Sequence, residues 1–225
     1  MHKNPDYLIK IWGSLMWKDD SMKELVQTIE EESDGKRIIV TTGSKDLSNV
    51  IRRYVADTLP DPISVETHVD ITMQARDMMA LAFSHASNKF VPVNSVGWID
   101  EALSWGKVPI LLQYDLLKSL RPFPIIRWLS TDTTSAYFAD LLKVRKFIKL
   151  TDVDGVYEKL WEWLPFSAIS TSELRNLGKT CVDTTLPDLL DRIKMRCYIM
   201  SGKKVPNLKK FLKCWSGLHT CVEPI

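Results

Sequence analysis

Long apolar runs are missing from this sequence. None approaches the roughly 20 consecutive apolar residues that a membrane-spanning helix needs, and the opening residues lack the apolar core of a secretory signal. An excess of one charge is also missing, because 30 lysines and arginines stand against 28 aspartates and glutamates, for a net charge of +2. Nucleic-acid-binding domains usually carry a clear basic excess. We therefore expect a soluble cytoplasmic protein that binds neither membranes nor nucleic acids.

Cysteine and histidine are scarce, with four residues of each type. Cys181, Cys197, Cys214 and Cys221 form no C-x-x-C pair, so the spacing of a zinc ribbon or a thioredoxin-like redox site is excluded. The histidines are scattered without a metal-like interval. We expect reduced thiols and no metal site built from these side chains.

Apolar residues are plentiful, and their pattern indicates a layered fold. They make up 45% of the 225 residues, which is enough for a large buried core. Short β-branched runs alternate with amphipathic stretches, a pattern typical of α/β proteins. We predict a three-layer α-β-α sandwich with a central, mainly parallel sheet, formed by one domain over residues 1–225. The expected strands are 7–12, 36–41, 89–93, 108–113, 145–151, 180–182, 196–200 and 219–222. The expected helices are about 21–34, 47–55, 67–85, 99–105, 132–142, 186–193 and 206–212.

Four junctions between a predicted strand and the helix that follows carry polar residues. Ligands bind beyond the carboxyl ends of strands in such sheets. The first two junctions, 9–15 and 40–46, combine a glycine with hydroxyl groups. The glycine allows a ligand to approach the backbone closely. The third, 130–136, places an aspartate at a predicted helix start. Each of these three also fits an ordinary turn, an N-cap or a solvated lysine. The fourth, 147–157, ends an apolar strand in two aspartates and a glycine, and is too specific a pattern for a simple turn.

Residues 150–157 (LTDVDGVY) resemble the nucleotide-site signature of the amino acid kinase family, which includes acetylglutamate kinase, aspartokinase, bacterial-type uridylate kinase and carbamate kinase. Residues 131–139 (TDTTSAYFA) are similar to the S-D-x-x-A-A-x-x-A segment of that family. Residues 10–15 (KIWGSL) resemble its opening K-x-G-G-S-L, and residues 42–44 (TGS) stand where the family carries a second glycine-rich loop. Essentially the whole chain shares the resemblance.

Within this family, the chain resembles most a short archaeal-type branch. Kinases of that branch phosphorylate 5-(aminomethyl)-3-furanmethanol phosphate in methanofuran biosynthesis. The shared features are the small size, the segment 98–111, the residues 114–117, and an ending at 198–208 that is similar to the V-V-N-G-x-x-P-x-x-L of the branch.

The resemblance implies direct in-line transfer of a phosphoryl group from ATP, with Mg²⁺ as cofactor, to a small phosphorylated acceptor, for which the branch suggests a furan compound. It implies that Lys10 offsets charge on the moving group and that Asp132 orients Lys10. It assigns no side chain as a metal ligand. Phosphate groups are expected to bind at Gly13, Ser14, Gly43 and Ser44, of which the last two would hold the acceptor. The nucleotide is expected to bind at Thr151, Asp152, Asp154, Gly155, Tyr157, Gly202 and Lys203.

The two glycine-rich loops depart from the family pattern. Trp12 replaces the first glycine of the first loop, and Thr42 and Ser44 replace two glycines of the second. The indole either narrows the space for a phosphate or stacks on an aromatic acceptor. Two alternatives therefore stay open: a nucleotide- or oxyanion-binding member of the fold that stores its ligand or serves as a regulatory subunit, and a nucleoside monophosphate kinase of the uridylate type. We expect a homo-oligomer, with the helix at 67–85 as a dimer face, and a hetero-oligomer as the alternative.

Overall fold

The computed structural model describes residues 3–16, 20–58, 64–120, 130–158, 163–178 and 180–225. The strands are β1 (Tyr7–Ile11), β2 (Ile38–Thr42), β3 (Phe90–Val93), β4 (Val108–Leu111), β5 (Lys146–Thr151), β6 (Ala168–Ser170), β7 (Cys197–Ser201) and β8 (Thr220–Glu223). The helices are α1 (Asp20–Glu32), α2 (Lys45–Thr58), α3 (Val65–Ser84), α4 (Val96–Ser104), α5 (Gln113–Ser119), α6 (Thr131–Leu141), α7 (Thr171–Asn176), α8 (Leu186–Ile193) and α9 (Val205–Cys214), with a short 3₁₀ helix η1 (Gly13–Met16).

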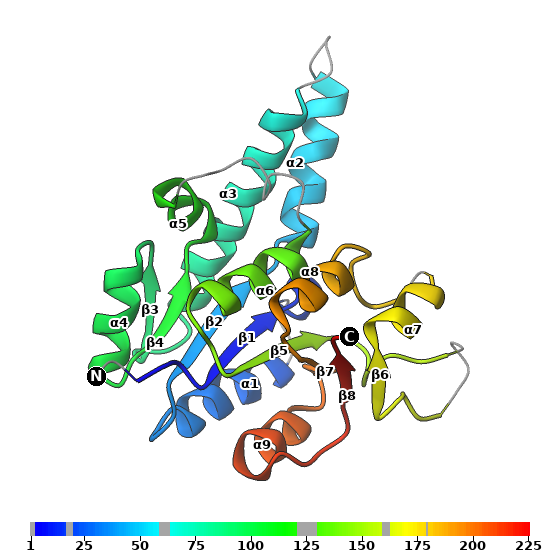
Figure 1. The fold of residues 1–225 in the computed structure, drawn as a ribbon. Helices are drawn as coiled ribbons and strands as arrows, with labels where there is room; N and C mark the ends of the chain where they lie inside the picture. The colour runs from blue at the N-terminus through cyan, green and yellow to red at the C-terminus, as the bar shows by residue number, and fades with distance from the viewer. Residues whose placement is uncertain (1–2, 17–19, 59–63, 121–129, 159–162, 179) are drawn as a thin grey trace.

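Within the described residues the strands form one eight-stranded sheet in the order β3-β4-β2-β1-β5-β7-β8-β6 (Figure 1). Of the strand pairs described, only β7 with β8 is antiparallel. Strand β1 lies at the centre between β2 and β5, so the carboxyl ends of β2, β1, β5 and β7 meet along one edge. The predicted three-layer sandwich with a mainly parallel sheet is confirmed.

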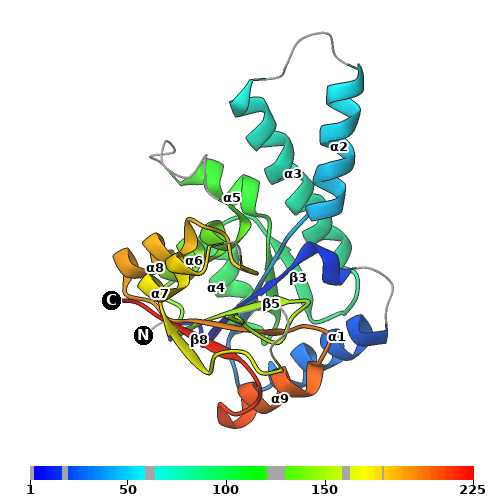
Figure 2. The ribbon, with the colours of Figure 1, turned by 90° about the vertical axis from the view of Figure 1, so that its right-hand side faces the viewer.

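Helices cover both faces of the sheet, which explains why its central strands are buried along their whole length rather than at alternate residues (Figure 2). One core cluster contains Leu8 of β1 together with apolar side chains of α4, α5, α6 and α8. The other contains Ile9 and Ile11 of β1 together with side chains of α1 and α9. Alternate residues of β1 therefore face different layers, and Lys10 shares the face of Leu8.

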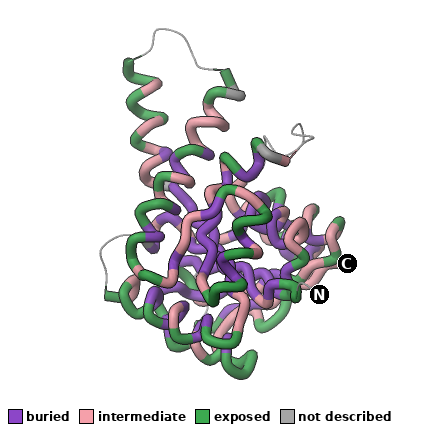
Figure 3. Tube along the Cα trace, turned by 90° about the vertical axis from the view of Figure 1, so that its left-hand side faces the viewer, coloured by how far each residue is buried: buried purple, intermediate pink, exposed green. Residues whose placement is uncertain are grey.

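Helices α2 and α3 extend side by side away from the sheet, as Figures 1 and 2 show. The sheet end of α3 is anchored in the core through Ala80 and Phe83, whereas the outer part of the pair is largely exposed or half-buried (Figure 3). In the described part of the chain, no helix is both long enough and apolar enough to cross a membrane.

The predicted strand at 180–182 is wrong, because these residues form no strand in the structure. Side chains rather than a neighbouring strand satisfy this backbone: Cys181 O accepts a bond from Lys149, and Asp183 N donates to Asp132. The strand predicted at 108–113 ends at Leu111, and α5 begins at Gln113. The short elements β6 and α7 were not predicted at all.

Candidate active site

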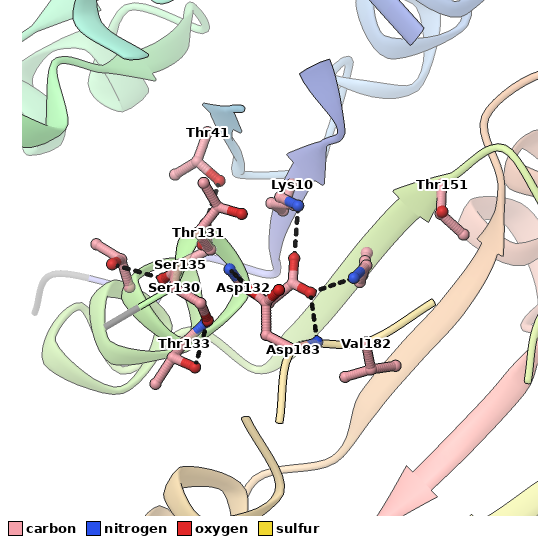
Figure 4. Close-up of polar contacts among 12 residues, drawn as sticks. Lys10, Thr41, Ser130, Thr131, Asp132, Thr133, Ser135, Thr151, Val182 and Asp183 are labelled. Atoms are coloured by element: carbon pink, nitrogen blue, oxygen red, sulfur yellow. Dashed lines mark hydrogen bonds and ion pairs between the residues drawn. The ribbon is translucent and has the colours of Figure 1, made fainter. Parts of the chain in front are cut away.

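Two buried lysines of the sheet bind one aspartate of α6, and Figure 4 shows Lys10 and Asp132 pointing toward each other. Lys10 of β1 and Lys149 of β5 are direct partners in the parallel register, so both side chains leave the same face of the sheet. Lys10 Nζ lies 2.5 Å from Asp132 Oδ1, and Lys149 Nζ binds the other carboxylate oxygen. Lys149 Nζ also donates to Cys181 O at 2.5 Å. The two predicted catalytic residues are thus in contact, and a second lysine joins them.

The Asp132 carboxylate is fixed from the backbone side as well. Asp132 N donates to Asp183 Oδ2 at 3.0 Å, and Asp183 N donates to Asp132 Oδ2 at 3.2 Å. The same helix start is capped by Ser130, whose hydroxyl accepts a bond from Thr133 N at 3.4 Å. These contacts hold the carboxylate in one orientation between the two ammonium groups.

Burial and charge act in opposite directions on this cluster. Burial alone would raise the pKa of Asp132, but the ammonium groups of Lys10 and Lys149 hold that pKa well below its ordinary value. Burial lowers the pKa of Lys10, and Asp132 opposes that shift. The pKa of Lys149 is raised despite burial, because Asp132 is so close. With both lysines protonated, the three side chains carry one net positive charge, which suits a polyanionic ligand.

The two predicted phosphate loops touch each other through their backbones. Gly43 N donates to Ile11 O at 2.9 Å. A Cβ atom built on Gly43 would lie 2.9 Å from Gly13 N, so residue 43 can carry no side chain without a shift of one loop. The loops after β1 and β2 therefore form a single backbone surface next to the lysine cluster.

The hydroxyl groups of these loops differ in their bonding. The Ser14 hydroxyl is buried and has no hydrogen-bond partner among the described residues. The Ser44 hydroxyl is instead paired with the Ser48 hydroxyl at 2.6 Å. A buried polar atom without a partner is uncommon in proteins and is expected where a ligand completes the bonding. Ser14 fits its predicted role better than Ser44 does.

The predicted nucleotide residues gather at the ends of β5 and β7. Thr151 and Ser201 are partners in the register, and Gly202 N donates to Thr151 O at 2.8 Å. The Asp152 and Lys203 side chains are exposed beside this junction. These residues therefore form one rim at the edge of the sheet that also carries the phosphate loops.

Asp154 lies in this rim but already has a protein partner. Its Oδ2 is 2.6 Å from Lys204 Nζ, a lysine that was not predicted. Burial and the nearby Asp154 carboxylate raise the pKa of the Tyr157 phenol. A Cβ atom on Gly155 would collide with the Thr220 hydroxyl, so packing alone demands a glycine there.

Trp12, which stands where the family has a glycine, lies beside the cluster and leaves the Lys10–Asp132 contact intact. Its backbone N donates to Leu150 O at 3.1 Å. Its ring centroid is 5.8 Å from Lys149 Nζ. The indole is thus placed where it can contact a ligand that binds next to the lysines.

Lys149 and Asp183 are site residues that the sequence reasoning missed. Lys149 carried a signal, because a lysine inside a buried apolar strand two residues before the TDVDG motif has no place in a simple core. Asp183 carries no such signal, since it follows a segment whose pattern predicts a strand.

The comparisons with known proteins agree with this geometry. Residues 7–200 match the model of the amino acid kinase family. The chain belongs to this family of phosphotransferases, as its motifs predicted.

Individual relatives are similar over almost the whole chain. The chain is 23% identical over 220 residues to the [5-(aminomethyl)furan-3-yl]methyl phosphate kinase of Methanocaldococcus jannaschii. The aligned region covers 97% of this chain and 98% of that relative. Among solved structures, it is similar to uridylate kinase from Archaeoglobus fulgidus, with a TM-score of 0.75, 18% identity, and coverage of 96% of this chain and 99% of that one. It is also similar to UMP kinase from Ureaplasma parvum, with a TM-score of 0.76, 17% identity, and coverage of 97% and 99%. The structural likenesses support the fold, and the curated relative is a kinase.

Proposed function

We propose that this protein transfers the γ-phosphoryl group of ATP to the phosphate of a small acceptor of furan type, as the name of its archaeal relative suggests. The observation that carries the proposal is the buried cluster of Lys10, Lys149 and Asp132. Its net positive charge supports the binding of two phosphorylated molecules that would otherwise repel each other.

The bonds that change fit these residues. The bond from the γ-phosphorus to the bridging oxygen breaks, its electron pair leaves with ADP, and an acceptor phosphate oxygen forms the new bond. A phosphate monoester is largely ionised near pH 7, since its second pKa is about 6. The acceptor oxygen therefore needs no general base. Asp132 suits the role of orienting the lysines, because its carboxylate is bonded on both oxygens and its pKa is lowered.

Lys10 would bind the transferring phosphoryl group and offset its charge. The orphaned Ser14 hydroxyl and the Gly13–Gly43 backbone surface fit phosphate oxygens. The rim at Thr151 and Gly202 would hold the nucleoside part.

Mg²⁺ would be bound mainly by phosphate oxygens. Among the described residues, no group of three or more histidine, cysteine, aspartate or glutamate side chains is arranged to hold a metal. Mg²⁺ commonly binds through substrate phosphates with one or two carboxylates. When bound, it supplies further neutralisation of phosphate charge.

The proposal is tested by measuring ADP release with MgATP and two acceptors, [5-(aminomethyl)furan-3-yl]methyl phosphate and UMP. We expect turnover with the furan phosphate, and a loss of about a thousand-fold in Lys10→Ala. Lys209→Met is the matched control, because Lys209 binds Glu31 on the surface of α1 and α9. Turnover with UMP alone would favour the uridylate-type alternative. Binding of ATP without turnover would favour a binding protein, an alternative that Trp12 motivates.

We further propose that residues 1–225 form one domain and that the protein acts in the cytoplasm as a homo-oligomer. The single sheet supports one domain. Exposed apolar side chains on the protruding helices support an oligomer face at Val50, Tyr54, Met78 and Leu81. Light scattering should give about twice the chain mass of 25.8 kDa or more, and a monomer mass would contradict the oligomer.

A further inference from the structure

Arg76 of α3 is a buried cation that the chemistry described so far does not use. This residue is only 4% exposed. Nη1 donates to Thr134 Oγ1 at 3.3 Å, whereas Nε has no hydrogen-bond partner among the described residues. None of the ion pairs formed within the described part of the chain includes Arg76. Arginine is rarely buried without a carboxylate or another anion.

Arg76 contacts both the start of α6 and the strand end before the glycine loop that would hold the acceptor. Its Thr134 partner follows Asp132 by two residues on α6. On the other side, the Thr42 hydroxyl donates to Arg76 O at 3.2 Å, and Thr42 directly precedes Gly43. The guanidinium is therefore held beside the helix start that carries Asp132, and the backbone of the same residue is bonded to the strand end that leads into the second glycine loop.

The carboxylates nearest to Arg76 already bind other groups of the protein. Burial lowers the pKa of Arg76 to about 10, and the charges of Asp183, Asp132 and Asp77 oppose that shift. Arg76 thus stays protonated at neutral pH. Asp132, however, is bonded to two lysines, and Asp183 accepts a bond from Asp132 N. An anion from outside the chain would complete the bonding of this guanidinium.

A second buried polar atom in this region is open as well. Gln113 is fully buried, and its Nε2 donates to Thr42 O at 2.9 Å. Its Oε1 has no partner among the described residues. An open donor on Arg76 and an open acceptor on Gln113, both on residues that contact Thr42, point to a polar ligand rather than to an apolar one.

We propose that Arg76 binds the anionic group of the acceptor and thereby restricts the enzyme to acceptors that carry a phosphate. This inference rests on the proposed kinase function and adds a specificity-determining residue to it. Guanidinium groups bind phosphate oxygens through paired N–H donors, which gives orientation as well as affinity.

The kinetic test compares Arg76→Met and Arg76→Lys with the wild type. We expect the KM for the furan phosphate to rise about ten- to a hundred-fold in Arg76→Met, with partial recovery in Arg76→Lys. The KM for ATP and kcat should change less than about three-fold. Arg53→Met, a change to an exposed arginine on α2, is the matched control and should leave all constants unchanged. An equal rise in the KM for ATP would overturn the proposal. A fall in melting temperature with an unchanged acceptor KM would also overturn it, because Arg76 would then contribute only to packing. Arg76→Gln carries the same expectation if Arg76→Met does not fold.

A binding test separates this proposal from the kinase function. Titration with inorganic phosphate is followed by calorimetry while a non-hydrolysable ATP analogue with Mg²⁺ fills the donor side. Phosphate should bind about ten-fold more weakly to Arg76→Met than to the wild type. That result in a protein without turnover would overturn the kinase function but keep the anion site. Equal phosphate affinity in both proteins would overturn the role of Arg76, even in an active kinase.

Discussion

Two aspartates of the candidate site bind lysines at nearly the same distance but in opposite environments. Asp132 Oδ1 lies 2.5 Å from Lys10 Nζ, and neither side chain is more than 2% exposed. Asp154 Oδ2 lies 2.6 Å from Lys204 Nζ, but that lysine side chain is 62% exposed. Water and salt screen the second pair, whereas a buried charge that loses its partner is left uncompensated. Burial rather than distance therefore decides which pair the fold and the chemistry depend on.

The largest effect is expected from removing the charge of Asp132. Asp132→Asn would leave Lys10 and Lys149 without a counterion, so the free energy of unfolding should fall by about 3 to 5 kcal/mol. Activity should fall about a thousand-fold, since the lysines lose their orientation. Urea denaturation and ADP release measure the two effects. An unfolding free energy equal to that of the wild type would remove the distinction between the two pairs.

Lys149 tests whether the net charge of the buried cluster matters. Lys149→Met keeps the Lys10–Asp132 pair but removes the excess positive charge, so ADP release should fall about a hundred-fold. Lys146→Met is the matched control from the same strand, because Lys146 lies over the Trp215 ring and away from Asp132. If both variants kept full activity, the excess charge would have no role.

Asp77 provides a half-buried carboxylate that forms no ion pair with a lysine among the described residues. It accepts bonds from Tyr114 N and Asp115 N, and burial raises its pKa to about 6. Because the folded state then binds a proton more tightly than the unfolded state, this group stabilises the fold at low pH and loses that contribution as pH rises from about 4 to about 6.

The variant Asp77→Asn removes this titration. The difference in unfolding free energy between the variant and the wild type should therefore grow in favour of the variant by about 1 to 3 kcal/mol from pH 4 to pH 7. Urea denaturation at several pH values measures it. A constant difference would show that Asp77 titrates normally.

The smallest effect is expected at the exposed pair. Lys204→Met should leave the denaturation midpoint unchanged, because exposed ion pairs contribute little. The KM for ATP should change by no more than about three-fold, since Asp154 stays in place. A large loss of stability in this variant would reverse the comparison between the buried and the exposed pair.

The sequence predicted most of the sheet, and the family resemblance implied that Asp132 orients Lys10. Strands such as β1 and β5 are short, largely apolar runs, and the glycine loops and the TDVDG turn are local patterns that can be read without knowing the packing. The resemblance also implied the roles of the loop residues, which lie along one edge of the sheet.

The sequence could not predict the contacts that depend on register and on the path of loops. Lys149 joins the site because it is the direct register partner of Lys10, on two strands that are adjacent in the sheet but far apart in the sequence. Arg76 and Asp183 reach the same region from α3 and from an irregular segment. Their placement follows from long-range packing, which the local periodicity of the sequence does not predict.

The buried cluster also has a consequence for the order in which the chain folds. Lys10 and Asp132 are 122 positions apart, and β1 and β5 are neighbouring strands of the sheet although they are far apart in the sequence. The first half of the chain alone would have to bury an ammonium group with no counterion. Closure of the long loop between the two halves should therefore be a late and slow event. Until this closure occurs, water must solvate the ammonium group of Lys10 on the partly formed sheet.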